Sequence, residues 1–175
     1  MAYALYLDIN RCSGCQACVV ACMDQNDLMI ENNTDGSWRQ VFAIEGGGFP
    51  ENEISYLSFA CLHCQDAPCI PACLTGAISR ENGFVVLNSA LCVGCHVCLT
   101  VCPFGIPRFD KNTKMQKCTM CKERIEEGLE PACVRVCSTK ALKLKIIDEL
   151  DIEKDESDQK SWSPLVHYLS VENDV

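Results

Sequence analysis

Short apolar runs and cysteine-rich loops alternate along the chain. The runs "YLDIN" (6–10) and "FVVLN" (84–88) both have a β-like composition, end in Asn and precede a tight loop with four cysteines. In each loop the last two cysteines are four positions apart, about one helical turn, so we expect the chain to leave both loops on a helix. A third stretch, "KERIEEGLEP" (122–131), predicts a helical turn or two that ends at Gly128 and Pro131.

One long stretch, from Phe84 to Pro107, contains no Lys, Arg, Asp or Glu. It is as long as a membrane-spanning helix, which needs about 20 apolar residues. Asn88, Gly94, His96 and four cysteines interrupt it, however, so we expect no membrane span.

The C-terminal stretch has an acidic part and an apolar part. Between residues 148 and 175, nine acidic residues stand against two lysines, so this segment carries −7 of the total net charge of −9. The apolar part, "WSPLVHYLSV" (162–171), is too short to form a core and too apolar to stay favourably in water. Two alternatives are open: it packs back on its own domain, or it docks on a partner or a second copy of the chain.

A basic segment, residues 107–124, carries six Lys and Arg residues against two acids. Proteins that bind nucleic acid display such patches, but charge runs are more often solvated. We therefore expect a solvated loop here and no nucleic-acid partner.

Cysteine dominates the composition. The chain has 175 residues, enough for one compact domain or two small ones, and 16 of them are Cys. The start "MAYALYLDINRC" has no charged n-region and no cleavage site of a secretory signal, and cytosolic thiols stay reduced. We therefore expect a cytoplasmic protein whose cysteines bind metal rather than form disulfides. Export to the periplasm on the signal of a partner is the alternative.

The cysteines fall into four groups that all open with C-x2-C and close with C-x3-C. The groups at 12–22 and 92–102 are tight, with the spacing C-x2-C-x2-C-x3-C, and the groups at 61–73 and 118–137 are open, with four and eleven residues in the middle. The order is tight, open, tight, open, and both open groups end in C-x3-C-x-T-x-A. This pattern indicates the duplication of a two-site unit.

The spacing of a tight group is that of an iron–sulfur ligand set. Three cysteines in C-x2-C-x2-C can wrap around one cube of iron and sulfide, and in two-cluster ferredoxins the fourth cysteine ligates the other cluster. Each group then gives three ligands to one cluster and one to a neighbour, so sixteen cysteines hold four [4Fe–4S] clusters. Zinc is the alternative, because C-x2-C pairs also occur in zinc ribbons. Taken alone, the group at 118–137 would resemble a zinc ribbon. Its place in the repeat of iron–sulfur groups argues against zinc.

Two histidines lie between cysteines of their groups, His63 and His96. We interpret them as hydrogen-bond donors to sulfur that shift a reduction potential, and not as further ligands, since the cysteines already complete the sites. No catalytic triad, phosphate loop or isolated carboxylate pair indicates a substrate site, so we expect no enzymatic activity of the chain on its own.

With these motifs the chain resembles the four-cluster iron–sulfur subunits of molybdenum or tungsten bis-pterin oxidoreductases, such as formate dehydrogenases and dimethyl sulfoxide reductases. The resemblance covers about residues 3–145. Besides the order of the groups it rests on "WRQV" (38–41), "CLHCQDAPCIPACLTGAI" (61–78), "CPFGIPRF" (102–109) and "KCTMCKERIEEGLEPACVRVC" (117–137). The chain departs from bacterial ferredoxins in that proline follows the last cysteine of only one group.

The resemblance implies four ligand sets, each made of three cysteines from one group and the last cysteine of another. They are Cys12, Cys15, Cys18 and Cys137; Cys22, Cys118, Cys121 and Cys133; Cys61, Cys64, Cys69 and Cys102; and Cys73, Cys92, Cys95 and Cys98.

The resemblance also implies an α+β fold of two ferredoxin-like halves in a pseudo-twofold arrangement. One half is contiguous and the other is discontinuous, because its groups lie at the two ends of the cysteine-rich region. The expected boundaries are 58–107 for the first half, 1–25 plus 115–145 for the second, 26–57 for an insertion, 1–147 for the whole domain and 148–175 for the C-terminal tail.

The expected function is that of an electron-transfer subunit. It would relay single electrons between a molybdenum or tungsten bis-pterin catalytic subunit, of the formate dehydrogenase or aldehyde oxidoreductase type, and another redox partner. That partner is a further electron-carrier subunit or a second copy of the chain. The alternatives are a free polyferredoxin shuttle and a subunit of a terminal reductase complex. A zinc-based binding module is disfavoured.

Overall fold

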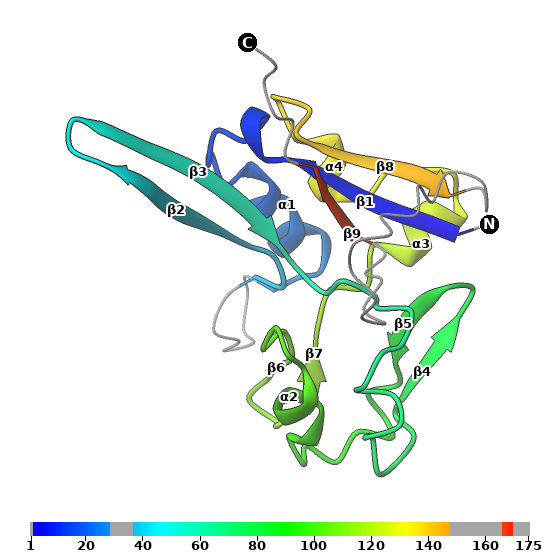
Figure 1. The fold of residues 1–175 in the computed structure, drawn as a ribbon. Helices are drawn as coiled ribbons and strands as arrows, with labels where there is room; N and C mark the ends of the chain where they lie inside the picture. The colour runs from blue at the N-terminus through cyan, green and yellow to red at the C-terminus, as the bar shows by residue number, and fades with distance from the viewer. Residues whose placement is uncertain (1, 29–36, 148–165, 170–175) are drawn as a thin grey trace.

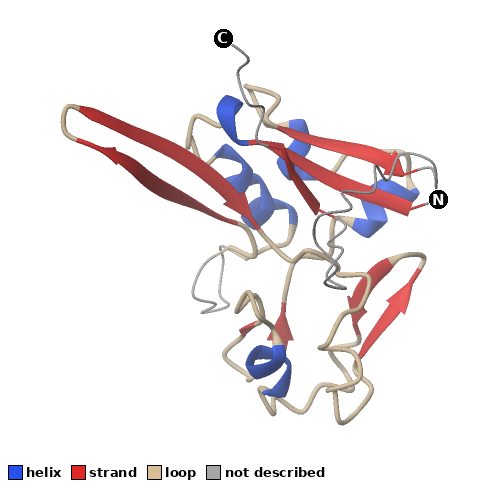
Figure 2. Ribbon diagram, in the orientation of Figure 1, coloured by secondary structure: helices blue, strands red, loops and turns tan. Residues whose placement is uncertain are grey.

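The computed structural model describes residues 2–28, 37–147 and 166–169, with only the backbone described for residues 2, 146, 147 and 166–169. The chain forms an α+β fold of short elements, as the sequence predicts (Figures 1 and 2). The strands are β1 (Ala2–Asp8), β2 (Gln40–Gly48), β3 (Glu51–Phe59), β4 (Ile78–Glu81), β5 (Phe84–Leu87), β6 (Arg108–Phe109), β7 (Met115–Gln116), β8 (Leu142–Ile147) and β9 (Val166–Leu169). The helices are η1 (Ile9–Arg11, a 3-10 turn), α1 (Ala17–Gln25), α2 (Val97–Val101), α3 (Lys122–Glu126) and α4 (Ala132–Arg135).

The helices expected around the cysteine groups are confirmed. α1 and α2 follow the two tight loops, and α3 occupies the middle of the last group. Gly128 beyond α3 has φ +76°, the left-handed conformation that often ends a helix, and Pro131 caps the start of α4. Within the described residues, no helix has both the length and the apolar character to cross a bilayer.

A three-stranded sheet joins the two ends of the chain. β1 lies in its centre, antiparallel to β8 and parallel to β9. Leu5 stands opposite Leu144 and Leu7 opposite Leu142, and Leu5, Leu7 and Leu142 are buried. Successive residues of a strand point to opposite faces, so these leucines turn one face of the sheet into the core.

The elements gather into two parts (Figure 1), each with a hydrophobic core, although Phe84 of β5 packs in the core of the first part. The first part contains β1, β8, β9, α1, α3 and α4, and the second contains β4, β5, β6, β7 and α2. Buried cysteines belong to both cores: Cys18 and Cys133 pack in the first, and Cys92 and Cys98 in the second. Ordinary apolar side chains thus make up only part of each core.

A long hairpin, β2–β3, extends away from the rest of the molecule (Figure 1). Its register runs from Gln40 opposite Phe59 to Gly48 opposite Glu51. The hairpin fills most of the expected insertion 26–57, for which the residue pattern alone predicts no particular secondary structure. Its base is anchored on the first part, because Phe59 packs against that core.

The C-terminal tail returns to its own domain in the one segment that is described. β9 pairs with β1, with Leu5 opposite Val166 and Asp8 opposite Leu169. Of the two alternatives for this tail, packing back is therefore the one observed for residues 166–169. The acidic part of the tail lies outside the described residues.

Candidate iron–sulfur sites

Four cavities are each lined by four cysteine side chains. Site one is the cavity lined by Cys12, Cys15, Cys18 and Cys137. Site two is lined by Cys22, Cys118, Cys121 and Cys133. Site three is lined by Cys61, Cys64, Cys69 and Cys102. Site four is lined by Cys73, Cys92, Cys95 and Cys98. The cavities bring together the same quartets that the resemblance implies, while ligation itself stays a prediction.

Helix α1 explains how one group serves two cavities. Cys18 and Cys22 both lie on this helix and both are buried. Residues four apart are close to one full turn apart and point to nearly the same side of a helix, about 6 Å along its axis. The loop before the helix curls around site one, so Cys18 lines that cavity and Cys22 reaches the next one.

The two tight loops share one backbone conformation. Gly14 has φ +68° and Gly94 has φ +70°, and the residue before each helix, Gln16 or His96, also has positive φ. A Cβ at Gly14 would lie 2.5 Å from the ring of Tyr56, and a Cβ at Gly94 would lie 2.5 Å from the carbonyl oxygen of Thr113. Glycine is therefore favoured at both positions for two reasons: the positive φ, and the lack of room for a Cβ beside Tyr56 or Thr113.

The two open groups share a threonine contact. The Oγ1 of Thr75 lies 3.7 Å from the Sγ of Cys73, and the Oγ1 of Thr139 lies 3.7 Å from the Sγ of Cys137. These threonines are the repeated residue in the pattern C-x3-C-x-T-x-A. The internal repeat read from the sequence thus extends to side-chain geometry.

Backbone amides donate to sulfur at three of the sites. The donors are Leu142 to Cys137 in site one (3.4 Å), Met120 to Cys118 in site two (3.3 Å) and Met115 to Cys92 in site four (3.4 Å). Hydrogen bonds to sulfur are one means by which a protein sets the reduction potential of a cluster.

Burial and hydrogen bonding shift the thiol pKa values in opposite directions. Burial strongly raises the pKa of Cys118, although the positive charge of Arg39 opposes this shift. Burial and the negative charges of neighbouring cysteines raise the pKa of Cys69 to about 11. Burial would also raise the pKa of Cys137, but hydrogen bonds from the Leu142 amide and from the Thr139 hydroxyl lower it. Without metal, Cys118 and Cys69 therefore hold their protons at neutral pH, and metal ligation has to displace them.

The donor set of each cavity, four cysteine thiols, fits an iron–sulfur cluster. In the described parts of the chain, no three His, Cys, Asp or Glu side chains come close enough together to hold one metal ion. Four thiols set apart around one cavity fit the larger iron–sulfur cube, which takes a thiolate at each of its irons.

The comparisons with known proteins agree with this geometry. A family of 4Fe-4S dicluster domains matches residues 52–147. The chain is 37% identical over 173 residues to the B subunit of the anaerobic dimethyl sulfoxide reductase of Escherichia coli (strain K12), a match that covers 93% of this chain and 82% of the relative. It is 38% identical to the thiosulfate reductase electron transfer subunit PhsB of Salmonella typhi, over 87% of this chain and 80% of the relative. It is 36% identical to the iron-sulfur subunit of the nitrate-inducible formate dehydrogenase of Escherichia coli (strain K12), over 79% of this chain and 52% of the relative.

The chain belongs to the 4Fe-4S dicluster family of iron–sulfur subunits. Like its relatives it is an electron-transfer subunit and is not catalytic on its own. Its sixteen cysteines in these spacings give it four [4Fe–4S] clusters as cofactors.

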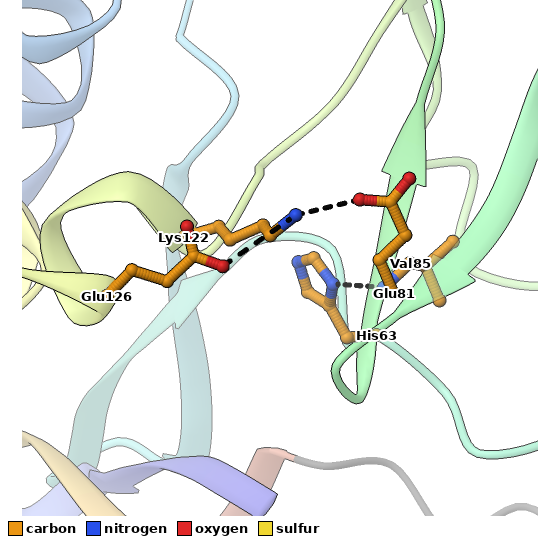
Figure 3. Close-up of polar contacts among 5 residues, drawn as sticks. All are labelled: His63, Glu81, Val85, Lys122 and Glu126. Atoms are coloured by element: carbon orange, nitrogen blue, oxygen red, sulfur yellow. Dashed lines mark hydrogen bonds and ion pairs between the residues drawn. The ribbon is translucent and has the colours of Figure 1, made fainter.

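In this dicluster protein, a buried polar network joins sites two and three. The amide of Val85 donates to the Nδ1 of His63 at 3.1 Å (Figure 3). The ammonium of Lys117, whose residue is only 5% exposed, donates to the carbonyl oxygens of Val85 and of Cys118, the latter at 3.1 Å. Lys117 also lines site three. A buried positive charge therefore lies at the boundary between site two and site three.

The structure places the two histidines in different surroundings. His63 is fully buried, burial and the charge of Lys117 lower its pKa, and its Nε2 has no hydrogen-bond partner among the described residues. His96 is exposed and stacks on Phe109, with ring centroids 3.7 Å apart. No hydrogen bond from either imidazole to a cysteine sulfur is found among the described residues, because the ring of His63 is turned to the Val85 amide and that of His96 to Phe109.

The eleven-residue interruption of the last group ties the two parts of the dicluster protein together. The ammonium of Lys122, at the start of α3, lies 2.8 Å from a carboxylate oxygen of Glu81 in β4 and 3.8 Å from one of Glu126 (Figure 3). Ile125 of the same helix is buried in the core of the first part. The interruption thus covers a flank of site two and reaches across to the part that contains sites three and four.

Proposed function

We propose that this chain relays single electrons between a molybdenum or tungsten bis-pterin catalytic subunit and another redox partner. The clusters would be held by the four cysteine sets that line sites one to four. Each cluster accepts and donates one electron at a time. The chain supplies their spacing, their shielding from water and the charges around them.

The observation that carries this proposal is a row of sites with accessible ends. Sites one and two share α1, and Lys117 lines site three while it contacts Cys118 of site two. Met115 lines both site three and site four. The exposed thiols among the sixteen are Cys15 in site one and Cys95 in site four. Electron transfer slows steeply with distance, so partners would exchange electrons with the exposed end sites.

The arrangement of the sites also supports the proposed division of the fold. Sites three and four are lined by residues between 61 and 117, and sites one and two by residues before 59 and after 117. We propose that these are two ferredoxin-like halves related by a pseudo-twofold, the second of them discontinuous. Since Ser58 lines site one while Met115 and Lys117 line site three, the contiguous half would begin after residue 58 and extend to about residue 117 instead of ending at residue 107. A cytoplasmic location is part of the proposal, because cluster ligation needs reduced thiols.

The type of catalytic partner rests on the relatives. The expected formate dehydrogenase or aldehyde oxidoreductase type has support from the formate dehydrogenase subunit, at 36% identity. The terminal reductase alternative has support from the dimethyl sulfoxide and thiosulfate reductase subunits, which match over a larger share of both sequences. We propose the reductase type on this coverage.

Native purification of the tagged chain tests the proposal. We expect a large chain that contains molybdenum or tungsten and a pterin to co-purify, and its reduced cofactor to reduce the clusters of this subunit. A chain that purifies alone with full clusters, and that exchanges electrons only with small soluble carriers, would contradict the proposal and support a free polyferredoxin.

A further inference from the structure

One arginine is buried between two of the cluster sites. Arg39, directly before β2, is only 4% exposed. Its Nη1 donates to the Oγ of Ser58 at 3.0 Å and to the carbonyl oxygen of the same residue at 3.5 Å. The backbone amide of Arg39 donates to the Oγ of Ser37 at 3.1 Å. Ser58 of β3 thus holds the guanidinium, and Ser37 holds the backbone of Arg39.

Arg39 touches the walls of both sites. It lines site two directly. Its acceptor Ser58 lines site one and has its Oγ 3.4 Å from the Sγ of Cys18. The guanidinium is therefore one hydroxyl group away from a cysteine of site one.

No acidic side chain balances this charge within the described residues. The ion pairs found there all belong to Lys122. A guanidinium stays protonated in proteins, and a buried charge without a counter-charge is costly. A cluster in site two, which Arg39 lines, would supply such a counter-charge.

Once clusters are bound, the cysteine sulfurs of sites one and two are thiolates, and these are the anions within reach of Arg39. Burial alone would lower the pKa of Arg39, but thiolates outweigh burial and raise it. In decreasing order of effect they are Cys133, Cys118, Cys18 and Cys22. Three of the four line site two, and Cys18 lines site one.

We propose that Arg39 is a charge shared by sites one and two that raises the reduction potentials of both clusters. The inference rests on the proposed electron relay, because it needs clusters at these two sites. An added electron makes a cluster more negative, so a fixed positive charge in a water-poor interior favours the reduced state. One residue would then raise the potentials of these two sites relative to those of sites three and four.

The test measures all four midpoint potentials by redox titration monitored by electron paramagnetic resonance. The complete subunit is used as Arg39→Gln, Arg39→Lys and, as control, Arg135→Gln. Arg135 lies between Cys133 and Cys137 but is exposed, so its removal deletes the same charge near the same ligands where water screens it. Iron and sulfide contents and co-purification of the catalytic chain report on the relay itself, separately from the potentials.

In Arg39→Gln with full iron, we expect two of the four potentials to fall. Each fall corresponds to at least a tenfold loss in the equilibrium constant for reduction, or about 59 mV for one electron. In Arg39→Lys and Arg135→Gln, the equilibrium constants for reduction of all four clusters should stay within about threefold of those of the unchanged protein. Lys retains the charge, and water and salt screen the charge of Arg135.

Three results would overturn the proposal: four unchanged potentials, a shift of one cluster only, or an equal shift of all four. If Arg39→Gln does not take up full iron, Arg39→Lys decides. Full iron with unchanged potentials in the Lys variant supports a role of the charge. Failure of the Lys variant to load would overturn it, because the fold would then need the planar guanidinium and not its charge.

Discussion

Two thiols on one helix give a sharp test of how the ligands are shared. Cys18 and Cys22 both lie on α1 but line different cavities, site one and site two. The double variant Cys18→Ala with Cys22→Ala removes one ligand from each of two clusters. The double variant Cys22→Ala with Cys121→Ala removes two ligands from the same cluster. Both doubles delete two thiols, so each is the control for the other.

The expected losses follow from four clusters of four irons each. The Cys22 and Cys121 double should alter one cluster and lose about a quarter of the iron at most. The Cys18 and Cys22 double should alter two clusters and lose up to about half. Iron and acid-labile sulfide assays give the loss, and electron paramagnetic resonance of the reduced protein gives the number of altered clusters. If the Cys18 and Cys22 double alters one cluster and the other double alters two, the cross-pairing is wrong.

Three further predictions concern folding, pH and a close backbone approach. Removal of the clusters with a chelator under reducing conditions should abolish the cooperative thermal transition, since cysteines form part of both cores and metal binding supplies folding free energy; a transition that stays near its original temperature by circular dichroism would contradict this. Burial raises the pKa of Cys69 to about 11, so at any lower pH iron must displace the proton of this thiol, and rising pH favours the cluster-loaded form. Bleaching of the visible absorbance by a chelator should therefore increase as pH falls from about 9 to 6. Bleaching that does not change with pH would refute this prediction. Gly14→Ala should lower the temperature of cluster loss by more than Gly76→Ala, because both glycines have similar positive φ but only a Cβ at Gly14 meets Tyr56, a clash of about 1–3 kcal/mol; equal effects of the two variants would show that the contact with Tyr56 is unimportant.

Local spacing allowed much of the site to be predicted. The cysteine groups, the helices that follow the tight loops and the helix at 122–126 depend on residues near one another in sequence. The four quartets were also expected, through the resemblance to a family. The repeat pattern had the further consequence, not anticipated, that Thr75 and Thr139 make the same contact with sulfur.

Long-range packing accounts for what the sequence did not reveal. The β2–β3 hairpin has exposed apolar residues such as Phe42 and Ile44, so its composition gives no clear alternation of buried and exposed positions. The burial of Arg39 and Lys117 depends on cysteines and strands distant in sequence, and a charged residue is normally expected at the surface. The pairing of β9 with β1 joins opposite ends of the chain.

The most direct test of the account is the cofactor content of the purified subunit, measured together with its reducing equivalents. Iron, acid-labile sulfide and zinc are assayed on the same anaerobic sample, which is then titrated with a reductant. The account predicts about sixteen irons and sixteen sulfides per chain, no stoichiometric zinc and uptake of about four electrons in one-electron steps. Stoichiometric zinc, or half the iron with uptake of about two electrons, would contradict it.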